Sequence, residues 1–300
     1  MDSINYSICT NITINDGYCY DLPICGYCYD FNTTLELGKN YELYNMMVIR
    51  ILLPVIGLFG LCGNGISAFI YSRKSMRSSM NIYLCALAIS DTVIILTAFL
   101  LFLIENLRYK SQLLSEIFAI LTPLTFPLGL TAQSSSVFLT VTSAIDCFMM
   151  IYSNPHCKRR FCTTSTAIKV NTDCQLSMVG MIFMSAMLYN SPHMFEINVV
   201  DCWNIEYAEK SIDVCPTDLR RNEPLTINFL ELLFGYVNSY LIDLSNLIVV
   251  LNSSCNFLIY FAFGSRFRKT LKEYVVTIFC RQSTNKLIST YKTESRNEIL

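Results

Sequence analysis

The sequence has few charged residues, one tryptophan and only two histidines. Charged side chains make up 15% of the 300 residues and hydrophobic ones 53%, whereas a soluble domain carries about 25% charge. So little polar surface cannot cover a globular domain in water. The net charge of −1 gives no sign of a nucleic-acid partner, and we expect none. The composition therefore indicates a membrane protein.

The motifs of common enzymes and transporters are also missing. The sequence has no GxSxG, HExxH or Walker-type loop, and no inverted repeat is visible. In the topology derived below, His156 and His193 fall on opposite sides of the membrane, so they cannot share a metal or a catalytic dyad. We therefore expect no enzyme activity and no metal site.

The first 46 residues lack the basic start and cleavage site of a signal peptide. Three glycosylation sequons mark this segment, at Asn5, Asn11 and Asn32. Four cysteines lie in it as well, namely Cys9, Cys19, Cys25 and Cys28. Outside the cell these cysteines would pair, and the spacing leaves three connectivities open. A zinc site on the CxxC pair is the less favoured alternative.

Five segments are apolar enough to cross a bilayer, which takes about 20 residues per helix. They cover about 47–71, 81–104, 117–145, 174–195 and 236–263. Such spans must be helices, and a regular series of short alternating segments, typical of strands, is absent. A further apolar stretch at 224–235 has about 12 residues, too few to span. The predicted fold is an all-α membrane bundle of five full spans plus this short segment.

Basic residues indicate the orientation. Fifteen of the 22 Lys and Arg residues lie in 72–80, 152–173 and 264–300, which places these segments in the cytoplasm. The sequons independently place the opposite side outside. The predicted organisation is therefore an extracellular tail (1–46), a transmembrane domain (47–263) and a cytoplasmic helix and tail (264–300).

Several polar residues interrupt the apolar spans. An ionised carboxylate such as Asp91 costs about 2.5–3.5 kcal/mol at the bilayer centre, so it requires polar partners. Asn64 lies in another span, and Asn252 and Asn256 share one face of the last. We expect these groups to form a polar site, although each asparagine could instead bond to a backbone carbonyl on its own.

The residues that carry a resemblance are Gly63-Asn64, Leu87-Ala88-x-Ser90-Asp91 and the run from Asn252 to Tyr260. Together they resemble the rhodopsin-type G-protein-coupled receptors, and Ser136, ten residues before Asp146, matches the third-helix sodium-site position. The resemblance implies a bundle of the seven-transmembrane receptor type and a sodium and water pocket. Its lining would comprise Asn64, Asp91, Ser136, Asn252 and Asn256.

Two segments are similar in particular to FMRFamide-type neuropeptide receptors: Pro127 to Gln133, and Asn252 to Arg268. This implies a peptide ligand, a heterotrimeric G protein and a multi-pass location in the plasma membrane. Membrane lipid and a receptor homo- or hetero-oligomer are further expected partners. Apart from sodium, the resemblance implies no cofactor.

After Tyr260, apolar and basic residues alternate with helical phase. Phe263, Phe267, Leu271 and Val275 predict an amphipathic helix along the inner leaflet, which resembles the eighth helix of the family. Cys280 follows it, and is either a palmitoylation site or an ordinary reduced cysteine.

The sequence departs from the family at two motifs. Asp146-Cys147-Phe148 replaces the Asp-Arg-Tyr that, with Asn256 and Tyr260, belongs to the activation machinery. Cys147 cannot form the forked ion pair of an arginine. Thr122 occupies the position of the outer third-helix cysteine, so Cys202 and Cys215 would pair with each other or with the tail.

The third departure is that the fifth helix and most of the sixth are missing between Glu223 and Pro224. Activation in the family moves the sixth helix, so we expect this form to activate a G protein poorly. The alternative is a non-signalling five-span isoform that regulates or traps a full-length receptor. A splice form, a wrongly joined gene sequence and a genuine five-span protein would all give this pattern.

Overall fold

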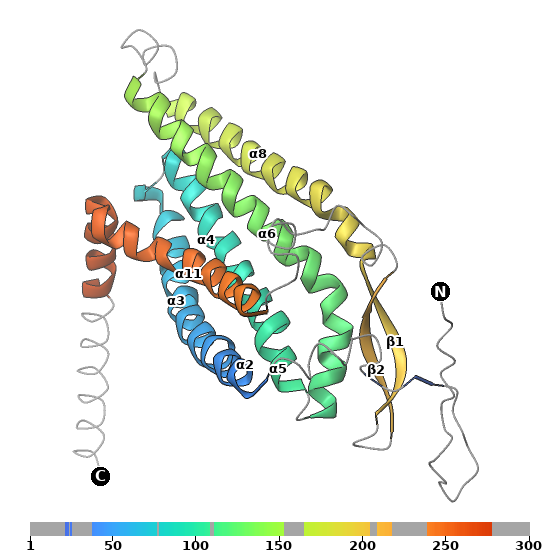
Figure 1. Cartoon of the computed structure of the whole chain (residues 1–300). Helices are drawn as coiled ribbons and strands as arrows, with labels where there is room; N and C mark the ends of the chain where they lie inside the picture. The colour runs from blue at the N-terminus through green and yellow to red at the C-terminus, as the bar shows by residue number, and fades with distance from the viewer. Residues whose placement is uncertain are drawn as a thin grey trace, which may run out of the picture.

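The chain is a bundle of long helices with a β-hairpin at one end (Figure 1). The structure is a computed structural model that describes residues 22–23, 25, 38–76, 78–108, 111–152, 165–204, 209–217 and 239–277. Several of the sequence predictions lie outside these residues: the sequons, the pairing of Cys9, Cys19 and Cys28, the junction of Glu223 and Pro224, the apolar stretch 224–235 and Cys280.

Two helical runs start the bundle. The first comprises α2 (Gly38–Asn45), the π-helical η1 (Met46–Leu52) and α3 (Leu53–Tyr71). After the short η2 (Lys74–Met76), the second comprises α4 (Ser79–Ala98), the π-helical η3 (Phe99–Ile104) and α5 (Glu105–Arg108). The later helices are α6 (Gln112–Tyr152), α8 (Ser165–Asn190) and α11 (Ser239–Phe263). A 3₁₀ turn, η4 (Ser191–Phe195), precedes the strands β1 (Ile197–Asn204) and β2 (Glu209–Pro216).

Within the described residues, four helical runs are long and apolar enough to cross a membrane. They are Asn40–Tyr71, Ser79–Arg108, Gln112–Phe148 and Tyr240–Phe263. Three of the five predicted spans lie wholly within them, and a fourth, 236–263, lies within them from Tyr240 onward. The remaining predicted span, 174–195, belongs mostly to α8, which is not among the four. That helix ends at Asn190 because Pro192 begins a 3₁₀ turn.

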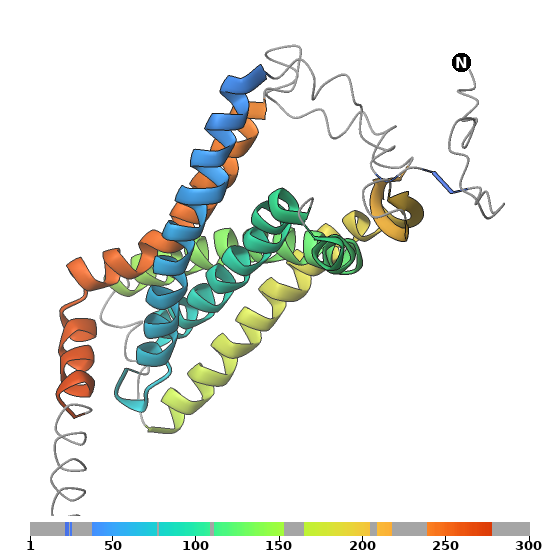
Figure 2. The same cartoon turned by 90° about the horizontal axis from the view of Figure 1, so that it is seen from below.

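The helix α4 lies at the centre and contacts α3, α6, α8 and α11. Figure 2 shows that α3 and α11 run side by side although they are far apart in sequence. Small residues allow this approach: a Cβ added at Gly60 would lie 2.7 Å from Ser254 Cβ, and one at Gly63 would lie 2.7 Å from Phe257 Cβ. Close packing through small residues is typical of helices in membranes.

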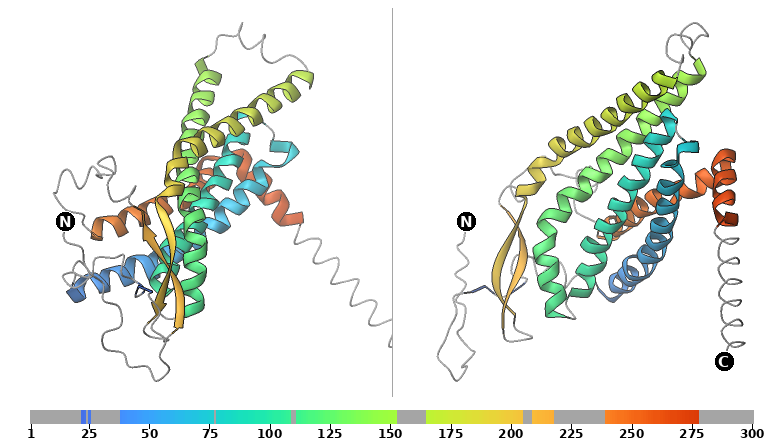
Figure 3. Two further views of the ribbon diagram at one scale, coloured as in Figure 1. Left: turned by 90° about the vertical axis from the view of Figure 1, so that its right-hand side faces the viewer. Right: turned by 180° about the vertical axis from the view of Figure 1, so that it is seen from behind.

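The hairpin of β1 and β2 corrects the expectation that strands are absent. The strands are antiparallel, with Ile197 opposite Pro216 and Asn204 opposite Glu209. Ile212 and Val214 alternate with polar residues along β2 and pack against Phe118 of α6. Alternation over so few residues is a weak signal beside the long apolar spans, which explains why it was missed. Figure 3 shows the hairpin beside the end of α6; we call this the hairpin end of the bundle.

The predicted amphipathic helix is present at 265–277, at the opposite end of the bundle. Phe267 is 2% exposed and packs on Tyr71 and Tyr260, with ring centroids 5.4 and 6.2 Å apart. Phe263 and Val275, expected on the same apolar face, are exposed instead. Gly264 interrupts the helix, so Phe263 belongs to α11 and has a different phase.

Candidate ligand pocket and polar core

A buried carboxylate joins three helices in the middle of the bundle. Asp91 of α4 is 0% exposed. Its Oδ1 accepts a hydrogen bond from Ser136 Oγ of α6 at 2.9 Å, and its Oδ2 accepts one from Asn256 Nδ2 of α11 at 2.6 Å. The partners that a carboxylate in an apolar span requires are thus supplied from neighbouring helices.

Asn64 extends this polar core to α3. It is fully buried, and its Nδ2 donates to the backbone oxygen of Ser253 at 3.0 Å. Asn64 Oδ1 has no hydrogen-bond partner within the described residues. Ser253 is 1% exposed and its hydroxyl also bonds to Asp91, a contribution that the sequence analysis missed.

The position of Asn252 contradicts the expectation that it belongs to the polar core. It is exposed, whereas Ser253 and Asn256 face inward. Successive residues of a helix are rotated by about 100°. The face centred on Ser253 and Asn256 therefore leaves Asn252 outside it.

The core residues fit the sodium ion that the family resemblance implies. A hard cation prefers oxygen ligands. Asp91, Ser136 and Ser253 present a carboxylate and two hydroxyls, and the unpaired Oδ1 of Asn64 is a further oxygen in the same core. A bound ion would add a positive charge beside a carboxylate whose partners among the described residues are all neutral.

The activation-motif residues lie on two helices. Asp146 of α6 is half-buried and acts electrostatically on Tyr83 of α4, while Cys147 is a free, half-buried thiol and Phe148 is exposed. Tyr260 of α11 packs edge-on against Tyr71, with ring centroids 5.3 Å apart. The charge of Asp146 thus acts on α4, while the ring of Tyr260 contacts α3 and the 265–277 helix.

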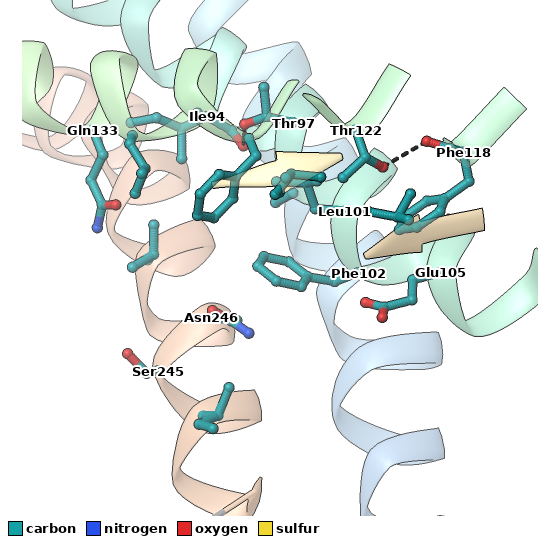
Figure 4. A pocket seen from close by; sticks show the side chains of 18 of the residues that line it. Ile94, Thr97, Leu101, Phe102, Glu105, Phe118, Thr122, Gln133, Ser245 and Asn246 are labelled. Atoms are coloured by element: carbon teal, nitrogen blue, oxygen red, sulfur yellow. Dashed lines mark hydrogen bonds between the residues drawn. The ribbon is translucent and has the colours of Figure 1, made fainter. Parts of the chain in front are cut away.

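A cavity of about 600 Å³ lies at the hairpin end, between α4, α5, α6, α11 and the hairpin (Figure 4). Aromatic and aliphatic side chains dominate its wall, including Ile94, Leu101, Phe102, Phe118 and Phe126. Its polar lining residues come from four helices: Thr97, Glu105, Thr122, Gln133, Ser245 and Asn246. An apolar cavity of this size with a few polar groups is typical of a ligand site.

The two threonines differ in kind from the other polar lining residues. Thr97 and Thr122 donate to backbone oxygens of their own helices, at 2.9 and 2.6 Å. Gln133, Ser245 and Asn246 form no side-chain hydrogen bond within the described part of the chain. These last three side chains are therefore available to a ligand.

The hairpin is fixed over the cavity by an ion pair that sequence reasoning did not predict. Arg108 Nη1 lies 2.7 Å from Asp213 Oδ1, and both side chains are almost fully buried. The Arg108 guanidinium also lies over the Phe118 ring, 5.0 Å from its centroid. Thr122, which replaces the family cysteine, is buried next to this contact area on α6.

A disulfide ties the N-terminal tail to the hairpin. Cys25 is bonded to Cys202, which resolves the open pairing of Cys202 in favour of the tail. Backbone hydrogen bonds extend the contact: Cys25 N donates to Trp203 O at 3.0 Å, and Trp203 N donates to Pro23 O at 2.7 Å. Cys215 is also disulfide-bonded. A zinc site that uses Cys25 is excluded, because the Cys25 sulfur is in a disulfide and cannot bind zinc as a thiolate.

The helical bundle, its buried Asp91 network and the cavity at the hairpin end define a helical membrane protein with a polar core and a ligand-sized cavity. Comparison with known proteins identifies its family. The chain is 45% identical to the probable G-protein coupled receptor frpr-1 of Caenorhabditis elegans, over 92% of this chain and 91% of that protein. The chain therefore belongs to the family of FMRFamide-type G-protein-coupled receptors, which are neuropeptide receptors.

More distant relatives agree. The chain is 25% identical to the FMRFamide receptor of Drosophila melanogaster, over 81% of this chain and 56% of that receptor. It is also 25% identical to the FMRFamide peptide receptor frpr-18 of Caenorhabditis elegans, over 77% of this chain and 69% of that receptor. No protein-family model matches the chain.

The alignments contain many positions with no counterpart in this chain. The alignment with frpr-1 runs over 345 positions but uses 92% of the 300 residues, about 276, which leaves about 69 positions opposite gaps. The same subtraction leaves about 79 positions for the Drosophila receptor and about 78 for frpr-18. Two spans of about 20 residues each and a connecting loop would occupy such a length.

Proposed function

We propose that the chain binds an FMRFamide-like peptide in the cavity at the hairpin end. The observation that carries this proposal is the cavity itself. It has an aromatic wall for apolar side chains of a peptide, and Gln133, Ser245 and Asn246 to bond its backbone or amide end. The hairpin contributes Ile197, Val214 and Pro216 to the lining, and Cys25 joins the tail to the hairpin.

The proposed location is the plasma membrane, with the hairpin end outside. The disulfide between Cys25 and Cys202 supports this orientation, because disulfides persist in oxidising compartments. The basic helix at 265–277 then lies along the inner leaflet. A glycosidase-sensitive shift in gel mobility that disappears when Asn5, Asn11 and Asn32 are replaced would support this orientation. Antibody labelling of a C-terminal epitope on cells that have not been permeabilised would contradict this orientation.

Coupling to a G protein is proposed to be weak in this form. Cys147 lacks the charge of the family arginine. The unmatched positions of the alignments support a missing block, which we place between Glu223 and Pro224. Peptide-dependent nucleotide exchange on a G protein by this chain alone would contradict the proposal.

The peptide site can be tested on membranes of cells that express the chain. Labelled FMRFamide should bind saturably, and Phe102→Ala should weaken binding at least tenfold because it removes part of the aromatic wall. Phe59→Ala is the matched control, since Phe59 is 47% exposed and does not line the cavity. Equal losses for the two variants, or no saturable binding by the wild-type chain, would exclude this site.

A second candidate function is that of a partner for a complete receptor. A groove of about 690 Å³ lies between α6 and α8 and is lined by Val137, Phe138, Ile182 and Tyr189, among others. Helices of another receptor would cover this groove in the membrane. Co-purification with a full-length relative that a Val137→Trp variant reduces would support this function. Purification of the chain as a monomer or as an oligomer of identical chains would argue against this second function.

A further inference from the structure

Among the described residues that line the cavity, one is charged, and it is an acid. Glu105 of α5 contributes its carboxylate to a wall that is otherwise apolar or neutral. Figure 4 shows the carboxylate directed into the cavity beside Phe102. Glu105 is half-buried, so the surrounding low dielectric strengthens its interaction with any charge inside the cavity.

The nearest cation forms its ion pair with another carboxylate, although its charge also acts on Glu105. Arg108 follows Glu105 by three residues, but its guanidinium bonds to Asp213 at 2.7 Å. Within the described part of the chain, Glu105 forms no ion pair within 4.0 Å and no side-chain hydrogen bond. The ion pair of Arg108 thus leaves the acidic group of the cavity for an external partner.

A second carboxylate adds to the negative potential at this end. Asp243 of α11 is 8% exposed, and its charge acts on Glu105. Its Oδ2 accepts hydrogen bonds from Tyr41 Oη at 3.1 Å and from Asn45 Nδ2 at 2.9 Å. Both donor groups are neutral. These bonds hold Asp243 in place without cancelling its charge.

We infer that Glu105 selects a ligand with a cationic side chain next to an aromatic one. A guanidinium would form a forked pair of hydrogen bonds with the carboxylate, while Phe102 and Phe118 hold the adjacent ring. A cavity of about 600 Å³ holds a few side chains rather than a whole peptide. The site therefore binds an arginine-aromatic end of the peptide. This inference rests on the peptide site proposed above.

The test compares FMRFamide with an analogue in which citrulline replaces arginine. Citrulline keeps the shape and loses the charge. Wild-type chain should bind the arginine peptide at least tenfold more tightly, and Glu105→Gln should bind both peptides alike, at the affinity of the wild-type chain for the citrulline peptide. Asp201→Asn is the matched control, because Asp201 is exposed on β1 outside the cavity and should keep the preference.

The outcomes separate this inference from the proposed function. If wild-type chain binds both peptides equally, or if Glu105→Gln keeps the full preference, the inference is wrong while the peptide site stands. If wild-type chain binds neither peptide, the proposed function fails and the inference with it. Equal affinity of the wild-type chain for the two peptides overturns the inference even if Glu105→Gln does not fold, and Glu105→Ser is the second variant, with the same expected loss of preference.

Discussion

Arg108 and Asp213 form a buried ion pair, 2.7 Å long, between the end of the second helical run and strand β2. It joins α5 to the hairpin, whereas Thr122 of α6, at the position that the resemblance assigns to a cysteine, cannot form a disulfide. The pair, together with the Phe118 ring beneath the guanidinium, fastens the hairpin to the helices.

Removing one partner of this pair should weaken the protein strongly. Arg108→Met leaves the carboxylate of Asp213 buried without its cation, and such losses cost about 3–5 kcal/mol. Thermal unfolding of the purified chain measures the effect. The pair of Lys210 and Asp201 is the control: its side chains are 58% and 54% exposed, so Lys210→Met should cost at most about 1 kcal/mol. Similar costs for both variants would contradict the role of Arg108.

The disulfide between Cys25 and Cys202 should stabilise the hairpin end as one unit. Cys25→Ser and Cys202→Ser should each lower the free energy of unfolding by about 2–5 kcal/mol, and the double variant should cost no more than either single one. Thiol labelling under nonreducing conditions provides a second readout, since each single variant exposes one new thiol. Additive losses would show that the two cysteines have different partners.

Of two asparagines on α11, Asn256 belongs to the polar core and Asn252 does not. Asn256→Ala removes a hydrogen bond to the Asp91 carboxylate and should cost about 1.5–3 kcal/mol in unfolding free energy. Asn252→Ala changes an exposed side chain four residues earlier and should stay within about 0.5 kcal/mol. Thermal unfolding of the two variants in the same detergent gives the comparison. A larger loss for Asn252→Ala would restore the original sequence prediction.

Two glycines of α3 should respond in opposite ways to the same substitution. A Cβ at Gly60 would lie 2.7 Å from Ser254 Cβ and 2.8 Å from Ile95 Cδ1, so Gly60→Ala should force α3 and α11 apart and cost about 1–3 kcal/mol. A Cβ at Gly65 meets nothing within 4 Å, so Gly65→Ala should be neutral or stabilise the helix by about 0.5–1 kcal/mol. Both values come from unfolding of the purified chain, and equal effects would contradict the close packing of α3 on α11.

The sequence predicted those parts of the fold that follow from the cost of placing polar groups in lipid. Long apolar runs had to be helices, and Asp91 had to have partners from neighbouring helices, two of which were Ser136 and Asn256. The four membrane-spanning runs and the receptor family follow from the same features.

Other features depend on contacts between distant segments that no local pattern reveals. Nothing near Arg108 in sequence indicates Asp213, which lies 105 residues further on. The exposure of Asn252 depends on how α11 is rotated against α3 and α4, and a shared helical face alone could not decide it. The strand β2 did have a local signal, the alternation of Ile212 and Val214 with polar residues, but it spans only a few positions.

The measurement that tests the peptide site most directly is photocrosslinking with an FMRFamide analogue whose C-terminal ring is photoreactive. Mass spectrometry of the crosslinked chain would locate the ring. The account predicts saturable crosslinks to the wall of the cavity, at Leu101, Phe102 or Phe118, that unlabelled FMRFamide prevents. Crosslinks only to the groove between α6 and α8, or crosslinks that unlabelled peptide does not reduce, would contradict it.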